Sequence, residues 1–383
     1  MNYRKKLYQI MTAFFLILLM VPAFGIFREK RNVDLIAIME NRTINPKPGS
    51  AFATKQFFRE FQNWFEDRLL GRKDLIHFWS NINGKLFHVL ISKEVVEGRN
   101  GFLFNPSYVT NHMNDRKQKL LQFALIKRIC DTYNVPFVFC LTPHGEWMLG
   151  EDLPQKQKPA DIAKIETELG TDLQKSGIDY CMFGSKMARL PAKERQSMYI
   201  KGDYHWNSKG AFFGTKELLR HIKLNKAIEN PVLYAVEERT QGEIYTRKIG
   251  RTAIESVVKV PWSDAYTKDF YIESHEGSDV LKDQGDGQKG ERIVRNPKAT
   301  YNITALVLGD SFFTLMEKYL MQDIGTIVFC HNRDIRKPKK NIDLERMIQT
   351  YKPNIVIYEK AGFTLFVDSY HANFGSWKQK IIK

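Results

Sequence analysis

Short apolar runs alternate with stretches of helical periodicity along most of the chain. The apolar runs predict strands at residues 135–141, 178–183, 304–308, 324–330 and 354–358. Apolar residues spaced three and four apart predict helices at residues 160–174, 312–320 and 342–351, and a further helix after Asn207. Apolar strands separated by helices are typical of a mostly parallel sheet that helices cover on both faces. The sequence therefore predicts an α/β fold.

The first 30 residues have the pattern of a membrane-directed segment. Arg4, Lys5 and Lys6 precede a mostly apolar run from Leu7 to Phe27, which is just long enough to cross a bilayer as one helix. A cleaved signal peptide has the same features, and we favour an uncleaved anchor because the run is longer than a usual signal core. Basic residues flank both ends of the run, so the charges do not determine its orientation.

The other segments complete the predicted organisation. Between residues 31 and 97, aromatic residues recur at helical spacing and predict a helical lead-in with a core-facing stripe. The main domain is expected at residues 98–383. Within it, the alternation stops from about 224 to 300, and we interpret this interval as an insertion that shapes a substrate groove. A polar, glycine-rich surface loop is expected at residues 276–290.

The net charge narrows the class of partner. The chain has 383 residues and a formal charge of +15, and its basic residues are spread along the chain rather than gathered in one block. Such a charge suits an anionic polymer or an anionic membrane surface. Nucleic acid is the rival partner, but the sequence lacks zinc-finger spacing, a single-strand aromatic platform and a basic helix. We therefore expect no nucleic acid to bind.

The cysteines do not indicate a metal site. Cys130, Cys140, Cys181 and Cys330 all lie in apolar patterns and have no metal-ligand spacing. We expect buried free thiols, no metal and no cofactor. A disulfide stays open as an alternative if the domain lies outside the cytoplasm, where such bonds persist.

Ser311 lies where a predicted strand turns into a predicted helix. Gly309 lets the backbone turn sharply there, and the first N–H groups of the helix point at any anion that forms beside the serine. A nucleophilic serine needs these features, because its attack on an ester creates an oxyanion. The alternative is an ordinary serine cap at a strand-to-helix junction.

A base for this serine is predicted in another segment. Asp203 and His205 are two residues apart, so in an extended segment they point to the same side. The carboxylate can orient the imidazole, which can then accept the proton of Ser311. Asn207 or Ser208 is expected to cap the helix that follows. A buried structural hydrogen bond is the competing interpretation of the Asp203–His205 pair.

These motifs resemble those of the SGNH-like O-acetyltransferases of cell-surface polysaccharides, in particular the alginate type. The matching segments are Asp203-Tyr204-His205-Trp206-Asn207 and Gly309-Asp310-Ser311-Phe312, in the order that this family shows. The resemblance extends over about residues 98–366. The segment from His144 to Trp147 departs from it, because the family is more basic there.

The resemblance implies an activity, partners and a location. The activity is transfer of an acetyl group through an acyl-enzyme on Ser311, with His205 and Asp203 completing the triad and the backbone N–H of Ser311 in the oxyanion hole. The implied partners are an anionic or neutral cell-surface polysaccharide and a membrane-bound O-acyltransferase that supplies acetyl. The implied location is the cell inner membrane, with a single-pass anchor and a periplasmic catalytic domain.

Two other functions and several weaker site residues stay open. If water accepts the acyl group, the same triad would act as a carbohydrate or lipid esterase. If the protein has no catalytic activity, its basic charge and anchor would suit a glycan-binding scaffold of a membrane assembly. His144, Trp206 and Tyr358 are candidate substrate contacts, each in competition with a structural role. Arg251 and Trp262 are candidate glycan contacts because of their place in the insertion.

Overall fold

The computed structural model describes a set of ranges along the chain. These ranges are residues 2–24, 45–70, 75, 78–79, 82, 95–109, 116–153, 158–229, 234–241, 254–262, 271–274, 291–331 and 343–365. By their contacts, the residues group into two units, one of residues 1–93 with 243–252 and the other of residues 94–242 with 253–383.

The first unit includes helix α3 (Lys55–Glu66), which forms over the predicted aromatic stripe. The side chain of Thr54 caps it by accepting a hydrogen bond from the N–H of Phe57, at 3.1 Å. Phe61 stacks on Phe57 and on Phe65, with ring centroids 6.1 and 5.8 Å apart. No residue of α3 is buried, so the expected core-facing stripe is not found there. The rings contact one another because residues four apart are neighbours on a helix.

Helix α1 (Asn2–Ala23) occupies the predicted N-terminal helix. Among the residues that the structure describes, none of the helices combines the length and the apolar character that a bilayer crossing requires. The last part of the predicted apolar run, residues 25–27, lies outside the described residues.

The second unit is built on a seven-stranded sheet with the order β4-β3-β11-β9-β10-β8-β7. Five neighbouring strands run parallel to one another: β4 (Asp179–Met182), β3 (Phe137–Thr142), β11 (Ile355–Ala361), β9 (Tyr301–Gly309) and β10 (Ile324–His331). These are the strands predicted from the apolar runs, with ends shifted by a few residues. The predicted parallel sheet is therefore confirmed for this part of the fold.

The interval predicted as an insertion contributes to the same sheet. Strands β7 (Tyr271–Ser274) and β8 (Glu291–Arg295) pair antiparallel, and β8 pairs antiparallel with β10. The sheet is therefore mixed rather than parallel throughout. Antiparallel neighbours need no crossover helix, so these short strands do not show the alternation of strand and helix patterns on which the sequence prediction was based. The expected surface loop at residues 276–290 lies outside the described residues.

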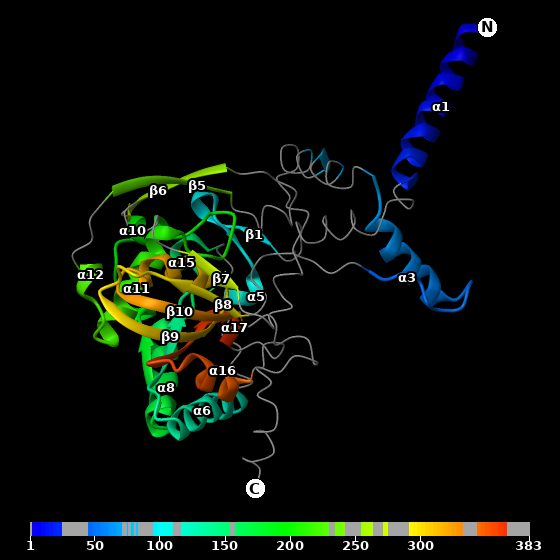
Figure 1. Cartoon of the computed structure of the whole chain (residues 1–383). Coiled ribbons are helices and arrows are strands. Elements are labelled where there is room, and N and C mark those ends of the chain that lie inside the picture. Colours follow the sequence, from blue (N-terminus) through cyan, green and yellow to red (C-terminus); the bar gives the residue numbers. More distant parts are fainter. Residues whose placement is uncertain are drawn as a thin grey trace. The chain divides into compact units, whose positions relative to one another are not determined.

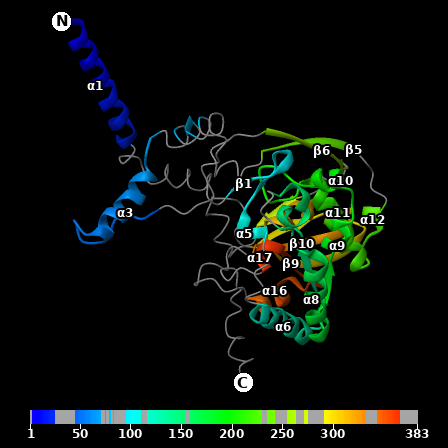
Figure 2. The ribbon, with the colours of Figure 1, turned by 180° about the vertical axis from the view of Figure 1, so that it is seen from behind.

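Helices cover both faces of this sheet (Figures 1 and 2). Helices α11 (Ser208–His221) and α15 (Ser311–Leu320) contact each other on one face. On the other face, α16 (Leu344–Tyr351) lies beside α6 (Arg116–Thr132), and α8 (Ile162–Lys175) packs against β4. The prediction included all of these helices except α6.

Short elements connect the sheet and the covering helices. They are β1 (Val96–Glu97), η3 (Arg99–Gly101), β2 (Leu103–Phe104), α5 (Pro106–Val109), α7 (Gly145–Met148), η5 (Gly150–Asp152), α9 (Gly184–Ala188), α10 (Ala192–Gln196), α12 (Lys226–Glu229), β5 (Tyr234–Gln241), β6 (Ile254–Trp262) and α17 (Gly362–Leu365). Strands β5 and β6 form a separate antiparallel pair.

Parallel strands bring three chain segments to one edge of the sheet. β3 ends at Thr142, β9 at Gly309 and β11 at Ala361, and these strands are neighbours in the order β3-β11-β9. Because the strands run in one direction, their carboxyl ends gather at the same edge, where ligands bind in α/β proteins. The Asp310-Ser311 turn and the loops after β3 and β11 therefore meet there.

Leu306 tests how much the central strand contributes to stability. Its side chain is fully buried in β9, so Leu306→Ala is expected to lower the free energy of unfolding by about 2–5 kcal/mol. Leu121 of α6 is 53% exposed, and Leu121→Ala is the matched control with an expected change within about 0.5 kcal/mol. Urea unfolding of both variants measures this difference, and equal losses would contradict the placement of β9 in the core.

Candidate active site

Asp310, not Ser311, caps the helix that begins after β9. Asp310 has extended backbone angles, and its Oδ1 accepts a hydrogen bond from the N–H of Phe312 at 3.0 Å. Ser311 is the first residue of α15, so its hydroxyl is not used as a cap. The alternative of an ordinary serine cap therefore does not describe this junction.

The second oxygen of Asp310 fixes the turn to the end of β11. Oδ2 accepts hydrogen bonds from the N–H of Ala361 at 2.9 Å and from the hydroxyl of Thr364 at 3.1 Å. Asp310 is 5% exposed, so these bonds replace the water that its carboxylate loses on burial. The residue next to Ser311 is thereby held from two strands.

Gly309 is required by close packing at the turn. A Cβ atom at this position would lie 3.0 Å from Cβ of Phe313, 3.0 Å from a ring carbon of Phe329 and 3.2 Å from Oε2 of Glu359. Distances this short force the neighbouring atoms to move. The glycine thus lets the strand, the helix and the Glu359 carboxyl approach one another.

The structure brings Asp203, His205 and Ser311 together in one hydrogen-bonded line. Nε2 of His205 lies 2.6 Å from Oγ of Ser311, and Nδ1 of His205 lies 2.8 Å from Oδ1 of Asp203. Asp203 accepts at Oδ1, so Nδ1 carries the donated proton and Nε2 is the acceptor that faces the serine hydroxyl. The side chain of His205 is 14% exposed and that of Asp203 is 8% exposed.

The backbone around His205 is held by short antiparallel pairing. The N–H of Ile200 donates to the carbonyl of His205 at 3.2 Å, and the N–H of Asn207 donates to the carbonyl of Met198 at 2.8 Å. The N–H of His205 also donates to Oδ1 of Asp203 at 3.2 Å. These bonds keep the segment extended, as the spacing of Asp203 and His205 requires.

Aromatic rings orient the imidazole of His205. The Tyr204 ring lies 4.4 Å from it and the Phe312 ring 4.8 Å, both measured between ring centroids. Both rings are tilted by little more than 30° from the imidazole plane. Such faces favour a positive charge on the imidazole, because the ring quadrupole attracts cations.

The predicted cap of the helix after this segment is confirmed. Oδ1 of Asn207 accepts hydrogen bonds from the N–H groups of Lys209 and Gly210, at 2.9 and 3.2 Å. Its Nδ2 donates to the carbonyl of Ser197 at 2.8 Å. Asn207 thus joins the start of α11 to the loop that precedes His205.

Trp206 lies in the interior instead of facing a substrate. Its side chain is 0% exposed and stacks on Phe183 with a centroid distance of 6.2 Å. Its indole N–H donates to the carbonyl of Phe312 at 3.2 Å. Trp206 therefore joins the His205 segment to α15, and its ring is not available to stack on a sugar.

His144 also lies inside the protein. It is 0% exposed, its Nε2 lies 3.1 Å from the carbonyl of Tyr108, and its ring is 4.7 Å from the Trp147 ring. Its Nδ1 is buried without a hydrogen-bond partner among the described residues. Burial lowers the pKa of His144 to about 3. A substrate contact is therefore not what its position indicates.

Of the remaining candidate contacts, the structure describes only the side chain of Tyr358, which lies in the core. Tyr358 is 0% exposed, packs against Phe123 in the core and shares a hydrogen bond of 3.4 Å with Oε1 of Gln122. Arg251 and the side chain of Trp262 lie outside the described residues. Sequence position near a strand end does not reveal how deeply a side chain is buried.

The sequence prediction missed two residues beneath the nucleophile. Glu359 of β11 accepts a hydrogen bond from the N–H of Asp310 at 2.9 Å and is joined to the hydroxyl of Thr142 at 2.6 Å. The only signal was their position at the ends of neighbouring strands. The contacts of Glu359 are with the turn rather than with Ser311 itself.

Ser311 provides a donor for an oxyanion. Its N–H is the first of α15, and no acceptor for it occurs among the described residues. The first N–H groups of a helix have no intrahelical partner and attract anions. Within the described part of the chain, no group of three acidic, histidine or cysteine side chains is placed to hold a metal ion. The four cysteines are buried, and none of them is joined to another in a disulfide.

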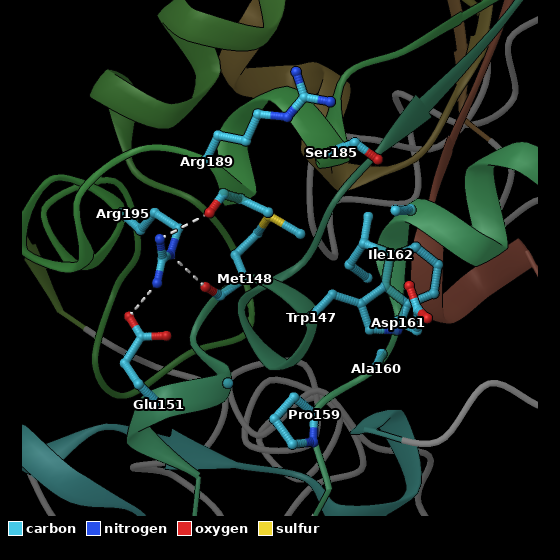
Figure 3. Close-up of a pocket in the computed structure, with 13 residues that line it drawn as sticks. Trp147, Met148, Glu151, Pro159, Ala160, Asp161, Ile162, Ser185, Arg189 and Arg195 are labelled. Carbon is cyan, nitrogen blue, oxygen red and sulfur yellow. Dashed lines mark hydrogen bonds and ion pairs between the residues drawn. The ribbon is translucent and has the colours of Figure 1, made fainter.

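A separate hollow of about 390 Å³ lies beyond the ends of β3 and β4, and it includes none of the three aligned residues (Figure 3). Its wall contains Arg195, whose guanidinium donates to Oε1 of Glu151 at 2.7 Å and to the carbonyl of Met148 at 3.0 Å. Arg195 thus stabilises the wall and is not free to bind a ligand.

Part of the chain is similar to a known family. Residues 95–250 match the family model described as SGNH hydrolase-like domain, acetyltransferase AlgX, which confirms the resemblance inferred from the motifs. The match includes Asp203 and His205 and ends before Ser311. No curated protein sequence matches the chain.

Several solved structures are similar to the chain. Bacillus cereus PatB1 gives a TM-score of 0.51 at 17% identity, over 72% of this chain and 98% of that chain. PatB1 with a sulfonyl adduct gives 0.53 at 17% identity, over 74% and 100%. The O-acetyltransferase domain of Pseudomonas putida AlgJ gives 0.43 at 13% identity, over 75% and 96%. The likeness to PatB1 shows a common α/β architecture.

Gly309→Ala tests the packing at the turn. The added Cβ would meet Phe313, Phe329 and Glu359, so the variant is expected to lose about 1–3 kcal/mol of unfolding free energy. Gly49→Ala is the control, since no atom lies within 4 Å of its added Cβ. Thermal and urea unfolding measure both variants. An alanine at position 309 that costs no more than the one at position 49 would contradict the close approach of Glu359.

His144 makes the folded state sensitive to acid. Its pKa is about 3 in the folded protein against 6.5 for an unperturbed histidine, so the unfolded chain takes up a proton below pH 6.5 that the folded chain does not. This contribution to stability is present above that pH and is lost as the pH falls toward 3. From pH about 7.5 to about 4.5 the loss is about 2–3 kcal/mol.

The neutral variant His144→Gln separates this effect from other acid effects. Glutamine keeps a donor for the Tyr108 carbonyl but does not titrate, so its unfolding free energy is expected to fall less steeply with acid than that of the wild type. His221→Gln, at a side chain that is 31% exposed, is the surface control. Parallel pH curves for wild type and His144→Gln would contradict a buried neutral His144.

Proposed function

We propose that this protein is an O-acetyltransferase that moves an acetyl group through Ser311 onto hydroxyls of an extracytoplasmic polysaccharide. The observation that carries the proposal is the line from Oδ1 of Asp203 through His205 to Oγ of Ser311, with links of 2.8 and 2.6 Å. The match of residues 95–250 to an acetyltransferase family supports it.

The first half of the reaction acetylates the serine. Oγ of Ser311 attacks the carbonyl carbon of the acetyl donor while its proton moves to Nε2 of His205. Asp203 stabilises the imidazolium that forms, because it accepts the hydrogen bond from Nδ1. The departing donor oxygen takes the proton from Nε2, and the acetyl ester on Ser311 remains.

The second half passes the acetyl group to the sugar. Nε2 of His205 accepts the proton of a sugar hydroxyl, whose oxygen attacks the ester carbonyl on Ser311. The bond to Oγ breaks, and Oγ recovers a proton from Nε2. In both halves the oxyanion forms beside the free N–H of Ser311 at the start of α15, where the helix end stabilises negative charge.

The partners and location in the proposal come from charge and family. A formal charge of +15 suits an anionic polysaccharide, and a neutral one binds through uncharged contacts. The acetyl donor is a membrane-bound O-acyltransferase, and the catalytic domain is periplasmic and anchored in the inner membrane.

Water in place of the sugar would make the protein an esterase with the same three residues. Incubating the purified full chain with an activated acetyl ester, with and without oligosaccharide, distinguishes the two reactions. Transfer predicts acetylated sugar that accumulates at the expense of free acetate. Free acetate release that is unchanged by oligosaccharide indicates hydrolysis.

Substitution of the three aligned residues tests the enzymatic role. Ser311→Ala is expected to lower acetyl transfer by at least about a thousandfold, because the acyl-enzyme no longer forms, and Asp203→Asn by a comparable factor. Ser176→Ala changes an exposed serine of the α8 end and is the matched control. Transfer is measured by mass spectrometry of the oligosaccharide.

A normal transfer rate in Ser311→Ala would contradict the proposal. The scaffold alternative has its own signature, which is a Ser311 no more reactive toward a serine-directed phosphonate than other serines of the chain.

A further inference from the structure

Two carboxyl groups are buried together behind the nucleophile. Glu359 is 0% exposed and Asp310 is 5% exposed. Oε2 of Glu359 accepts a hydrogen bond from the backbone N–H of Asp310 at 2.9 Å, and its Oε1 lies 2.6 Å from Oγ1 of Thr142. Glu359 therefore links the carboxyl ends of β3, β11 and β9 at the residue that precedes Ser311.

The surroundings of the two carboxyl groups indicate which one carries the negative charge and which one carries the proton. Asp310 accepts from the N–H of Phe312, the N–H of Ala361 and the hydroxyl of Thr364, and three donors stabilise its carboxylate form. Two neighbouring carboxylates away from water repel each other, so such a pair holds one charge and one proton. Glu359 is the more deeply buried of the two, at 0% exposure against 5% for Asp310, so it is the one that holds the proton.

The surroundings of Glu359 agree with this division. Burial raises the pKa of Glu359 well above its usual value, and the charge of Asp310 raises it further. The hydrogen bonds with the hydroxyl of Thr142 and with the N–H of Asp310, and then the charge of Lys360, act in the opposite direction to a smaller extent.

The other titratable groups that face the pair are Tyr358, Cys140 and His144. Burial raises the pKa of Tyr358, a hydrogen bond with Cys181 and burial raise that of Cys140, and burial lowers the pKa of His144 to about 3. All three therefore stay neutral near neutral pH and add no charge to the site.

We propose that Glu359 is a positioning residue that, as a neutral carboxylic acid, fixes the Asp310-Ser311 turn so that the serine hydroxyl stays on Nε2 of His205. Its carbonyl oxygen accepts a hydrogen bond from the N–H of Asp310. Its other oxygen lies 2.6 Å from Oγ1 of Thr142, so an ionised Glu359 accepts a hydrogen bond from that hydroxyl and the protonated acid of the proposal donates one to it. The tight approach at Gly309, where an added Cβ would lie 3.2 Å from Oε2, leaves the turn no room to shift.

The proposal predicts that glutamine can take over the role of Glu359 and that leucine cannot. The amide of Glu359→Gln has one acceptor for the Asp310 N–H and one donor for Thr142, as the neutral acid has, and no charge at any pH. Glu359→Leu fills a similar volume but leaves the Asp310 N–H buried without an acceptor. Raising the pH ionises the wild-type Glu359 and places a second negative charge under Ser311, which the glutamine variant avoids.

The rate at which a sulfonyl fluoride modifies Ser311 in the purified full chain tests these differences. A structure of PatB1 with a sulfonyl adduct makes this reagent a suitable probe for the fold. Glu359→Gln is expected to react within about threefold of wild type. Glu359→Leu is expected to react about a hundredfold more slowly, because a small displacement of the nucleophile has that cost. Glu168→Gln, on the surface of α8, is the matched control.

Two outcomes in folded variants overturn the proposal. A Glu359→Gln protein as slow as Glu359→Leu shows that an ionised carboxylate is required, and a Glu359→Leu protein as fast as wild type shows that the residue positions nothing. The pH profile gives a further readout, since the rate should decline at alkaline pH in wild type relative to Glu359→Gln. Profiles of identical shape throughout the alkaline range contradict a neutral Glu359 in the wild type.

Infrared difference spectroscopy tests the protonation state of Glu359 independently of the proposed function. Only the rate at which Ser311 is modified rests on the proposed function. The carbonyl band of a protonated carboxylic acid is expected in wild type and absent in Glu359→Gln, whether or not Ser311 reacts. A missing band in wild type overturns the neutral acid even if Glu359→Leu fails to fold. If the band is present but wild-type Ser311 does not react with the sulfonyl fluoride, Glu359 is a neutral acid as inferred and the proposed enzymatic function is contradicted.

Discussion

One hydrogen bond of 2.6 Å, between Oγ of Ser311 and Nε2 of His205, joins segments that are 106 residues apart. Its two ends are fixed by different means. The serine end belongs to the central β9–α15 junction, where the backbone is held from the neighbouring strands. The histidine end belongs to a loop, where antiparallel pairing with residues 198–200 and the carboxylate of Asp203 replace the support of a sheet. The site needs both, because general-base catalysis depends on hydrogen-bond contact between the two side chains.

Buried polar groups supply the link between these two supports. Trp206 donates its indole N–H to the carbonyl of Phe312, so the residue after the histidine holds the residue after the serine. Beneath the serine, Glu359 and Asp310 connect three strand ends in the interior. Burying polar groups lowers stability unless each of them forms hydrogen bonds. The turn is therefore held by hydrogen bonds between residues that are distant in the sequence and close in space. The same buried hydrogen bonds therefore stabilise this edge of the sheet and keep Ser311 aligned with His205.

Local patterns in the sequence were sufficient for the parallel strands and for the three aligned residues, because strand period, helix period and the two-residue spacing of Asp203 and His205 are properties of nearby positions. The antiparallel strands β7 and β8 at one side of the sheet were missed, because no local pattern in the sequence specifies which sheet a short strand joins. The roles of Glu359 and Thr142 depend on a contact between residues 217 apart. The sequence left open whether Trp206 and His144 contact a substrate or have a structural role, because distant segments decide how deeply a side chain is buried.

The central claim is that the aligned Ser311 carries the acetyl group between donor and sugar. The most direct measurement is mass spectrometry of the full chain, digested after a brief exposure to an activated acetyl ester and an acid quench without acceptor. The account predicts one added acetyl group on the peptide that contains Ser311, and its disappearance when oligosaccharide is added before the quench. An unmodified Ser311 peptide in a protein that still transfers acetyl to the sugar would contradict the account.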